Sequence, residues 1–188
     1  MVHVTEENVE IIDVDLLIQE CLRASEGKEA FAYIISPFIS DFILSPSWLS
    51  FVSNIIEVAD IDSYVDLVGL LRHHGVDVRV VTRSPADLRT TTISRKFIDK
   101  QERTLAQLAK MGCEIRTNAS LHAKATLTSG GVLAGSFNLT QSGRSLNLEA
   151  GFYFPNTFGI EKREYEDKLE WAQRLFSESV PVNNSRLR

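Results

Sequence analysis

The segment from Leu121 to Gly151 constrains the fold most, because it contains two short runs on either side of a glycine-bearing loop. In the first run, Leu121 to Thr128, apolar residues occupy every second position and polar residues fill the positions between them. Residues two apart in a strand lie on the same face of a sheet. The second run, Val132 to Asn138, follows Ser129-Gly130-Gly131, and together they predict a β-hairpin.

The register of this hairpin decides which polar side chains meet. A three-residue loop at 129–131 pairs Lys124 with Ser136, on one face and about 5 Å apart. The same loop pairs His122 with Asn138. A two-residue glycine turn shifts the register by one residue and separates these side chains. We expect the three-residue loop, because such loops commonly hold a glycine in the left-handed region.

These side chains suit the chemistry of a tetrahedral anion such as a phosphate. Lys124 supplies a positive charge and three donors, and Ser136 and Asn138 supply neutral donors. The imidazole of His122 serves as nucleophile, base or acid near neutral pH. Glu149 is placed to accept a hydrogen bond from the second ring nitrogen of His122 and so fix the tautomer of that imidazole. The absence of a second nearby His, Cys or carboxylate cluster at ligand spacing argues against a metal site.

The pattern His122-x-Lys124, followed by Gly135-Ser136-x-Asn138, resembles the HKD motif of the phospholipase D superfamily. Glu149 stands where the small nuclease members of that family carry a supporting glutamate. The flanks, residues 36–40 and 75–83, are similar too, so the resemblance covers roughly residues 29 to 155.

One position departs from the motif. The family carries Asp seven residues after the His, whereas this chain carries Ser129. That Asp is described as supporting the site and not as attacking phosphorus. Taken by itself, Ser129 is most simply a turn residue.

The resemblance implies a metal-independent phosphodiesterase that needs no cofactor. The family mechanism uses two motifs, and this chain has one, so a homodimer is implied. One His122 then forms a phosphohistidine while the His122 of the second protomer protonates the leaving oxygen. Nucleic acid is the expected substrate, DNA before RNA, with the chain acting as an endonuclease.

The expected site residues fall into two groups. Those expected to be catalytic are His122, Lys124, Asn138 and Glu149. Those expected to bind substrate are Ser136, Arg83 and Arg144.

Three alternatives remain open. The first is that the chain is a lipid phosphodiesterase or phosphatidyl transferase. The second is that it is a non-catalytic nucleic-acid-binding module. In the third it is one subunit of a larger DNA-processing complex. The lack of an amphipathic membrane helix or an exposed apolar stretch places the lipid reading below the nuclease.

Charge is distributed unevenly along the 188 residues, although the net charge is only −5. Residues 1–71 carry 2 basic and 13 acidic side chains, whereas residues 72–144 carry 12 basic and 5 acidic ones. The basic region, residues 72–144, is the one that contains His122 and Lys124. A locally basic surface beside an anion-binding patch suits a polyanionic substrate.

The sequence also predicts the setting of the protein. Two distant cysteines, Cys21 and Cys113, indicate a reducing compartment instead of a disulfide framework. An acidic start without a signal-peptide pattern, and no apolar run near 18 residues, predict a cytoplasmic protein that does not span a membrane.

Alternating strands and helices predict one α/β domain over residues 1–188, with a core at about 12–178 and a frayed tail at 181–188. The expected architecture is an α/β/α sandwich, a mixed sheet with helices on both faces. Helices are expected from Asp13 or Asp15 to Ala24, over 63–74, over 94–111, in one turn at 140–145 and over 161–177. Strands are expected at 29–36, 76–82, 113–116 and 147–154, besides the hairpin, and residues 83–93 are expected to form a loop.

Overall fold

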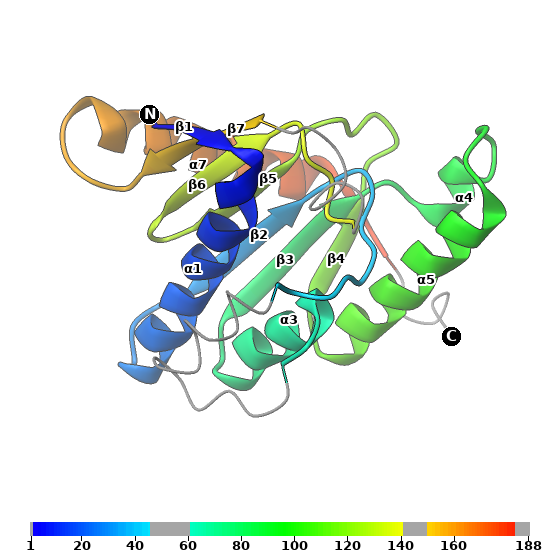
Figure 1. The fold of residues 1–188 in the computed structure, drawn as a ribbon, viewed down its shortest axis with the longest axis horizontal. Helices are drawn as coiled ribbons and strands as arrows, with labels where there is room; N and C mark the ends of the chain where they lie inside the picture. Colours follow the sequence, from blue (N-terminus) through cyan, green and yellow to red (C-terminus); the bar gives the residue numbers. More distant parts are fainter. Residues whose placement is uncertain (1, 46–60, 141–149, 183–188) are drawn as a thin grey trace.

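The computed structural model describes residues 2–45, 61–140 and 150–182. In this part of the chain a mixed sheet of eight strands forms the centre, in the order β1-β7-β6-β5-β2-β3-β4-β8 (Figure 1). The strands are β1 (Val2–Thr5), β2 (Phe31–Ile35), β3 (Asp77–Thr82), β4 (Glu114–Thr117), β5 (Ala125–Thr128), β6 (Gly131–Gly135), β7 (Ala150–Pro155) and β8 (Val180–Pro181).

Strand direction changes within the sheet. The strands β2, β3 and β4 are parallel neighbours, whereas β5, β6, β7 and β1 follow as antiparallel neighbours on the side of β2. Ile35, the last residue of β2, pairs with Ala125, the first residue of β5. We call this end of the sheet, where β2 ends at Ile35 and β3 ends at Thr82, the carboxyl edge.

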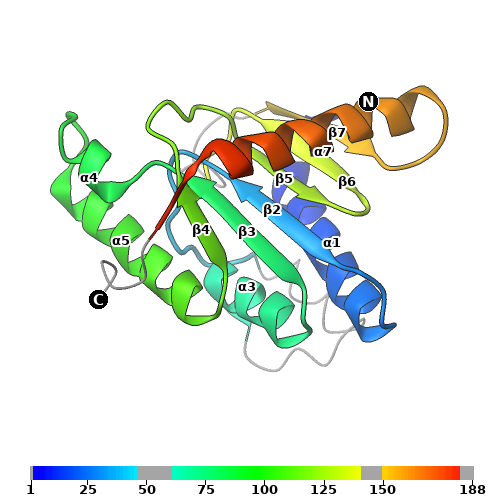
Figure 2. The same ribbon diagram turned by 180° about the vertical axis from the view of Figure 1, so that it is seen from behind.

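Helices cover both faces of the sheet, which confirms the predicted α/β/α sandwich. The helices α1 (Glu6–Ser25), α3 (Tyr64–His73) and α5 (Arg95–Lys110) pack on one face. Helix α7 (Ile160–Glu178) packs on the other face, as the view from behind shows (Figure 2). The short helix α4 (Pro85–Leu88) follows β3.

The sequence of β2 is apolar without alternation because the strand is buried on both faces of the sheet. Ile34 is fully buried in the cluster under α1, α3 and α5. Its neighbours Tyr33 and Ile35 are buried in the cluster under α7. A central strand covered on both faces needs apolar residues at every position, because neither face meets water.

Local signals set the ends of helix α3. Ser63 is the N-cap and forms a capping box with Asp66, which satisfies two backbone donors at the start of the helix. Gly75 follows the C-cap with φ +85°, a conformation that glycine adopts without strain. The predicted helix over 63–74 is therefore confirmed to within one residue at each end, although the cap is Ser63 and not Asp62.

The first helix was predicted to start too late in the chain, and the strand that precedes it was not predicted. Helix α1 begins at Glu6, not at Asp13 or Asp15, because Val9 continues its buried face against Leu133 and Phe137. Strand β1 precedes it and pairs with β7, which the sequence did not predict. An edge strand whose partner lies about 150 residues away leaves little local signal.

Two further expectations need correction. The predicted loop over 83–93 contains α4, which Ser84 caps by accepting from the backbone N–H of Asp87. The tail expected to fray from residue 181 begins inside β8, where Pro181 pairs with Arg116 of β4. Residues 183–188 lie outside the described residues.

Candidate functional site

The hairpin that carries the motif has a different register from the predicted one. Leu127 pairs with Val132 and Ala125 with Ala134, so the loop is Ser129-Gly130 and Gly131 already belongs to β6. A Cβ on Gly131 would come within 2.7 Å of the Tyr153 side chain and 2.8 Å of a backbone oxygen. Glycine is therefore required here by close packing against β7, and the predicted three-residue loop was wrong.

The motif residues nevertheless lie at the same end of the sheet. The backbone N–H of Gly135 donates to the carbonyl oxygen of Lys124 at 3.1 Å, so Lys124 faces Gly135 and not Ser136. His122 and Lys124 precede β5, while Ser136 and Asn138 follow β6. In an antiparallel hairpin these two ends lie side by side. Both lie at the carboxyl edge, because β5 begins opposite the end of β2.

His122 and Lys124 are linked directly. The Lys124 ammonium donates from Nζ to the backbone carbonyl oxygen of His122 at 2.7 Å. The His122 side chain is exposed, and Lys124 is half-buried. This bond holds a positive charge at the backbone of a histidine whose own side chain is exposed, and a cation and an imidazole on neighbouring positions suit attack on an anionic phosphodiester.

Ser136 ties the end of β6 to the start of β7. Its backbone N–H donates to the Ala150 carbonyl oxygen at 3.0 Å, and its Oγ accepts from the Ala150 N–H at 3.2 Å. Ala150 is the chain neighbour of Glu149, which lies outside the described residues. Arg144 and the part of the predicted helical turn after Thr140 lie outside them too.

Asn138 and Arg83, at the carboxyl edge, each have a buried polar atom. Asn138 Oδ1 and Arg83 Nε are buried and have no hydrogen-bond partner among the residues that the structure describes. Arg83 follows β3 directly, and its backbone N–H donates to the Pro37 carbonyl oxygen at 3.4 Å. Leaving a buried polar atom unpaired costs free energy, so the two atoms mark a place where the described hydrogen bonds are incomplete.

Sequence reasoning missed two buried polar residues of α5 that hold the loop after β2. Gln101 Oε1 accepts from the Ile39 N–H at 3.4 Å, and Thr104 Oγ1 accepts from the Asp41 N–H at 3.0 Å. Gln101 also donates from Nε2 to the Arg83 carbonyl oxygen at 2.8 Å. One signal was available: Gln101 lies on the same helix face as the apolar residues Ile98, Leu105 and Leu108.

The same loop receives the chain after β6. Leu139 donates its N–H to Ser36 Oγ at 3.2 Å, and its carbonyl oxygen accepts from the Ser40 N–H at 2.8 Å. The backbone beside Asn138 is thus fixed against the loop that follows β2, and α5 fixes that loop from below. Rigid support of this kind keeps catalytic side chains in position.

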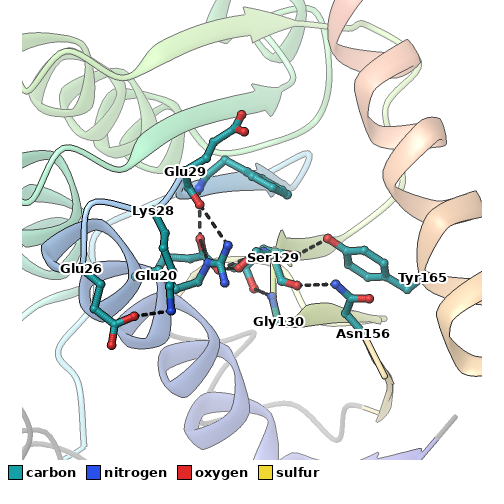
Figure 3. A network of polar contacts seen from close by, with 11 residues as sticks. Glu20, Glu26, Lys28, Glu29, Ser129, Gly130, Asn156 and Tyr165 are labelled. Carbon is teal, nitrogen blue, oxygen red and sulfur yellow. Dashed lines mark hydrogen bonds and ion pairs between the residues drawn. The ribbon is translucent and has the colours of Figure 1, made fainter. Parts of the chain in front are cut away.

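Ser129, at the departure from the motif, is held by a carboxylate from another element (Figure 3). The fully buried side chain of Glu20, on α1, accepts from the Ser129 N–H at 2.9 Å and also from Ser129 Oγ. Its second oxygen accepts from the Phe31 N–H at 3.1 Å. Asn156 Nδ2 donates to the Ser129 carbonyl oxygen at 2.8 Å, so the loop is fixed from two sides.

Two other properties of the described chain bear on function. Within residues 2–45, 61–140 and 150–182, no group of three His, Cys, Asp or Glu side chains is arranged to hold a metal ion. The helices of that same part of the chain are all too short or too polar to cross a membrane.

Comparison with known proteins places this geometry in a family. Residues 51–172 match the family model described as cardiolipin synthase, PLD-like domain. A comparison with curated protein sequences finds no match.

Solved structures share the fold at low sequence identity. Nuc from Salmonella typhimurium, a phospholipase D family member, is 17% identical with a TM-score of 0.56, over 88% of this chain and 90% of Nuc. NucT from Helicobacter pylori is 11% identical with a TM-score of 0.59, over 96% of this chain and 98% of NucT. TrmBL2, an archaeal chromatin protein, is 14% identical with a TM-score of 0.50, over 96% of this chain and 53% of TrmBL2.

The family model spans well over half of the chain, and it includes both halves of the motif at the carboxyl edge. This chain therefore belongs to the phospholipase D superfamily.

Proposed function

We propose that this protein is a metal-independent phosphodiesterase that cleaves nucleic acid, as a DNA endonuclease. The observation that carries the proposal is the exposed His122 beside Lys124, whose ammonium is bound to the carbonyl oxygen of the same histidine. The basic region 72–144, with 12 basic and 5 acidic residues, surrounds this pair in the sequence and suits a polyanion. The fold shared with TrmBL2, a chromatin protein that binds DNA, supports DNA as the substrate.

The proposed reaction proceeds in two displacements. A ring nitrogen of His122 attacks phosphorus, and a nitrogen–phosphorus bond forms while the bond to the leaving oxygen breaks. His122 of a second protomer donates a proton to that oxygen. The second imidazole then takes a proton from water, whose oxygen attacks phosphorus and releases the first His122.

A homodimer follows from this scheme, because each chain contributes one His122. A two-fold axis through the site would bring the two imidazoles to opposite sides of one phosphorus. Two copies of Lys124 and Asn138 would hold the nonbridging oxygens and stabilise the charge that develops there. Glu149 would orient His122, and Ser136, Arg83 and Arg144 would contact the phosphate backbone.

The decisive experiment compares His122→Ala with His73→Ala on plasmid and single-stranded DNA, with and without EDTA. His73 is an exposed histidine at the end of α3, so its replacement controls for loss of a surface imidazole. The wild type and His73→Ala are expected to cleave in EDTA, and His122→Ala is expected to lose at least about 1,000-fold. Full cleavage by purified His122→Ala would contradict the proposal.

A direct test of the intermediate is mass spectrometry after rapid acid-free quenching. We expect a phosphorylated peptide that contains His122 in the wild type and its absence in His122→Ala. Analytical ultracentrifugation tests the dimer separately. A purely monomeric enzyme with full activity would rule out the two-histidine scheme.

A lipid phosphodiesterase is the second candidate, and two observations favour it. The matching family model is named for cardiolipin synthase. Phe158, between β7 and α7, is 92% exposed and Ile160, the first residue of α7, is 75% exposed, and exposed apolar side chains of this kind favour membrane surfaces. Release of headgroup from anionic phospholipid vesicles, with no cleavage of DNA, would establish this candidate over the nuclease.

A further inference from the structure

A pocket of about 250 Å³ opens beside Asn138 at the carboxyl edge. Three separate segments form it: the loop after β2, the start of α5 with Ile93 two residues before it, and the chain that leaves β6. Its lining residues are Phe38, Ile93, Phe97, Asn138 and Thr140. We call it the Phe97 pocket.

Two of the five lining residues are aromatic. The rings of Phe38 and Phe97 lie 5.6 Å apart at an interplanar angle of 80°, and both side chains are only half-buried. An edge-to-face pair presents one ring face toward the space beside it. The pocket is smaller than typical drug-sized sites, so it suits a single planar group.

A polar side chain lines the same pocket. Asn138 is half-buried there and carries a carboxamide. A carboxamide pairs with the donor and acceptor edge of a nucleobase, and unstacked bases are recognised in this way between aromatic rings. The aromatic rings suit the flat surface of a base, and the amide suits its polar edge.

Charge beside the pocket suits the backbone that carries such a base. Arg95 and Lys96 precede Phe97 directly, and both side chains are exposed. Lys100 and Arg103 continue the exposed basic face along α5. A strip of cations beside aromatic rings is the arrangement by which proteins bind single strands.

We infer that the Phe97 pocket receives an unpaired nucleobase next to the scissile phosphate, and that the enzyme therefore prefers single-stranded DNA. The inference rests on the proposed function for the identity of the substrate. A base inside a duplex is stacked and paired, so it is available to this pocket only after unpairing. Asn138 then contacts both the phosphate group and the adjoining base.

Binding by the His122→Ala protein tests the pocket without catalysis. Oligo(dT) and an abasic oligonucleotide of equal length carry the same charge and differ only in their bases. We expect the former to bind roughly tenfold more tightly at fixed salt, because each stacked base adds to affinity. Phe97→Leu, which keeps an apolar side chain in the pocket, is expected to abolish this difference, while Phe97→Tyr is expected to keep it.

Phe158→Ala serves as the matched control, because Phe158 is an exposed aromatic residue that does not line the pocket. Its oligo(dT) preference is expected to equal that of the parent protein. Equal affinity of the parent for the two oligonucleotides, or an unchanged preference in Phe97→Leu, would overturn the inference. Circular dichroism of Phe97→Leu verifies that the loss is not one of folding.

An abasic oligonucleotide used as substrate separates this inference from the proposed function. Its cleavage by the wild type reports phosphodiesterase activity without any base. Base-dependent binding without cleavage of any strand would contradict the proposed function and leave the pocket inference standing. Cleavage of the abasic strand without base-dependent binding would contradict the pocket inference and leave the proposed function standing.

Discussion

Gly135 shows how a single residue shapes the site. It ends β6, directly before Ser136. A Cβ at this position would lie 2.5 Å from the Ala150 carbonyl oxygen and 2.5 Å from the Phe137 ring. The strand that delivers Ser136 and Asn138 therefore reaches β7 only because it lacks a side chain at its last position.

Gly135→Ala is expected to destabilise the protein by about 1–3 kcal/mol, because the backbone and a buried ring must move to admit the methyl group. Gly130→Ala is the matched control, since its Cβ would make contacts at 3.7 Å. The measurement is urea unfolding followed by circular dichroism. A Gly135→Ala variant as stable as Gly130→Ala would show that β6 and β7 are not in close contact here.

In the proposed reaction, Lys124 contributes its charge more than its packing. Lys124→Met is expected to lower the turnover number by about 100-fold, because it removes the cation that the proposal assigns to developing negative charge. The thermal midpoint should stay close to that of the wild type, since the side chain is only half-buried. Lys110→Met, at an exposed lysine in the last turn of α5, is the control and should leave turnover unchanged.

At the scale of elements, the hairpin depends on a helix from the other end of the sequence. Glu20 and Ser129 are 109 residues apart, yet the Glu20 carboxylate accepts two hydrogen bonds from Ser129 and one from Phe31. One buried carboxylate thus joins α1, the start of β2 and the turn between β5 and β6. Position 129, where the family motif has Asp and this chain has Ser, therefore still has a carboxylate beside it, that of Glu20.

Glu20→Gln is expected to cost about 2–3 kcal/mol, because an amide offers one acceptor oxygen in place of two and leaves donors unpaired. Ser129→Asp should destabilise the wild type, where it places two carboxylates together, but stabilise the Glu20→Gln protein. A double-mutant cycle by urea unfolding measures this change of sign. Additive effects would show that the two residues are not coupled, and Glu26→Gln, at an exposed glutamate, controls for loss of charge alone.

For the whole molecule, three buried acids link stability to alkaline pH. Burial raises the pKa of the Cys21 and Cys113 thiols from 9.0 to about 12. Burial, and then the charge of Glu20, raises the pKa of the Tyr165 phenol from 10.0 to about 12. Between pH 9 and 12 the unfolded chain loses these protons while the folded chain keeps them.

The unfolded state therefore binds fewer protons in this window, and the free energy of unfolding falls as pH rises from about 9 to 12. Below pH 9 these groups contribute no pH dependence. Urea midpoints at pH 8, 10 and 11 are expected to decline, with a shallower slope in Cys21→Ala/Cys113→Ala. An equal slope in this variant would show that the thiols are not the cause.

Helices and their ends could be predicted where the signal is local. Gly75 follows α3 and Gly112 follows α5, each with φ +85°, whereas the N-cap of α3 is Ser63, one residue after the expected Asp62. Capping acts over a few residues, so the sequence contains the whole interaction. The start of α1 could not be placed in this way, because Val9 is buried by residues of β6 and the chain after it.

The sequence by itself determined that the four motif residues lie at one end of the sheet. His122 and Lys124 lie just before one strand of a hairpin and Ser136 and Asn138 just after the other, so any tight turn brings them to the same end of the sheet. Only the tertiary structure decided the register, because the crowding at Gly131 comes from Tyr153 of β7. Alternation of apolar residues fixes the face of a strand, whereas contacts between segments far apart in the chain fix its position along the neighbouring strand.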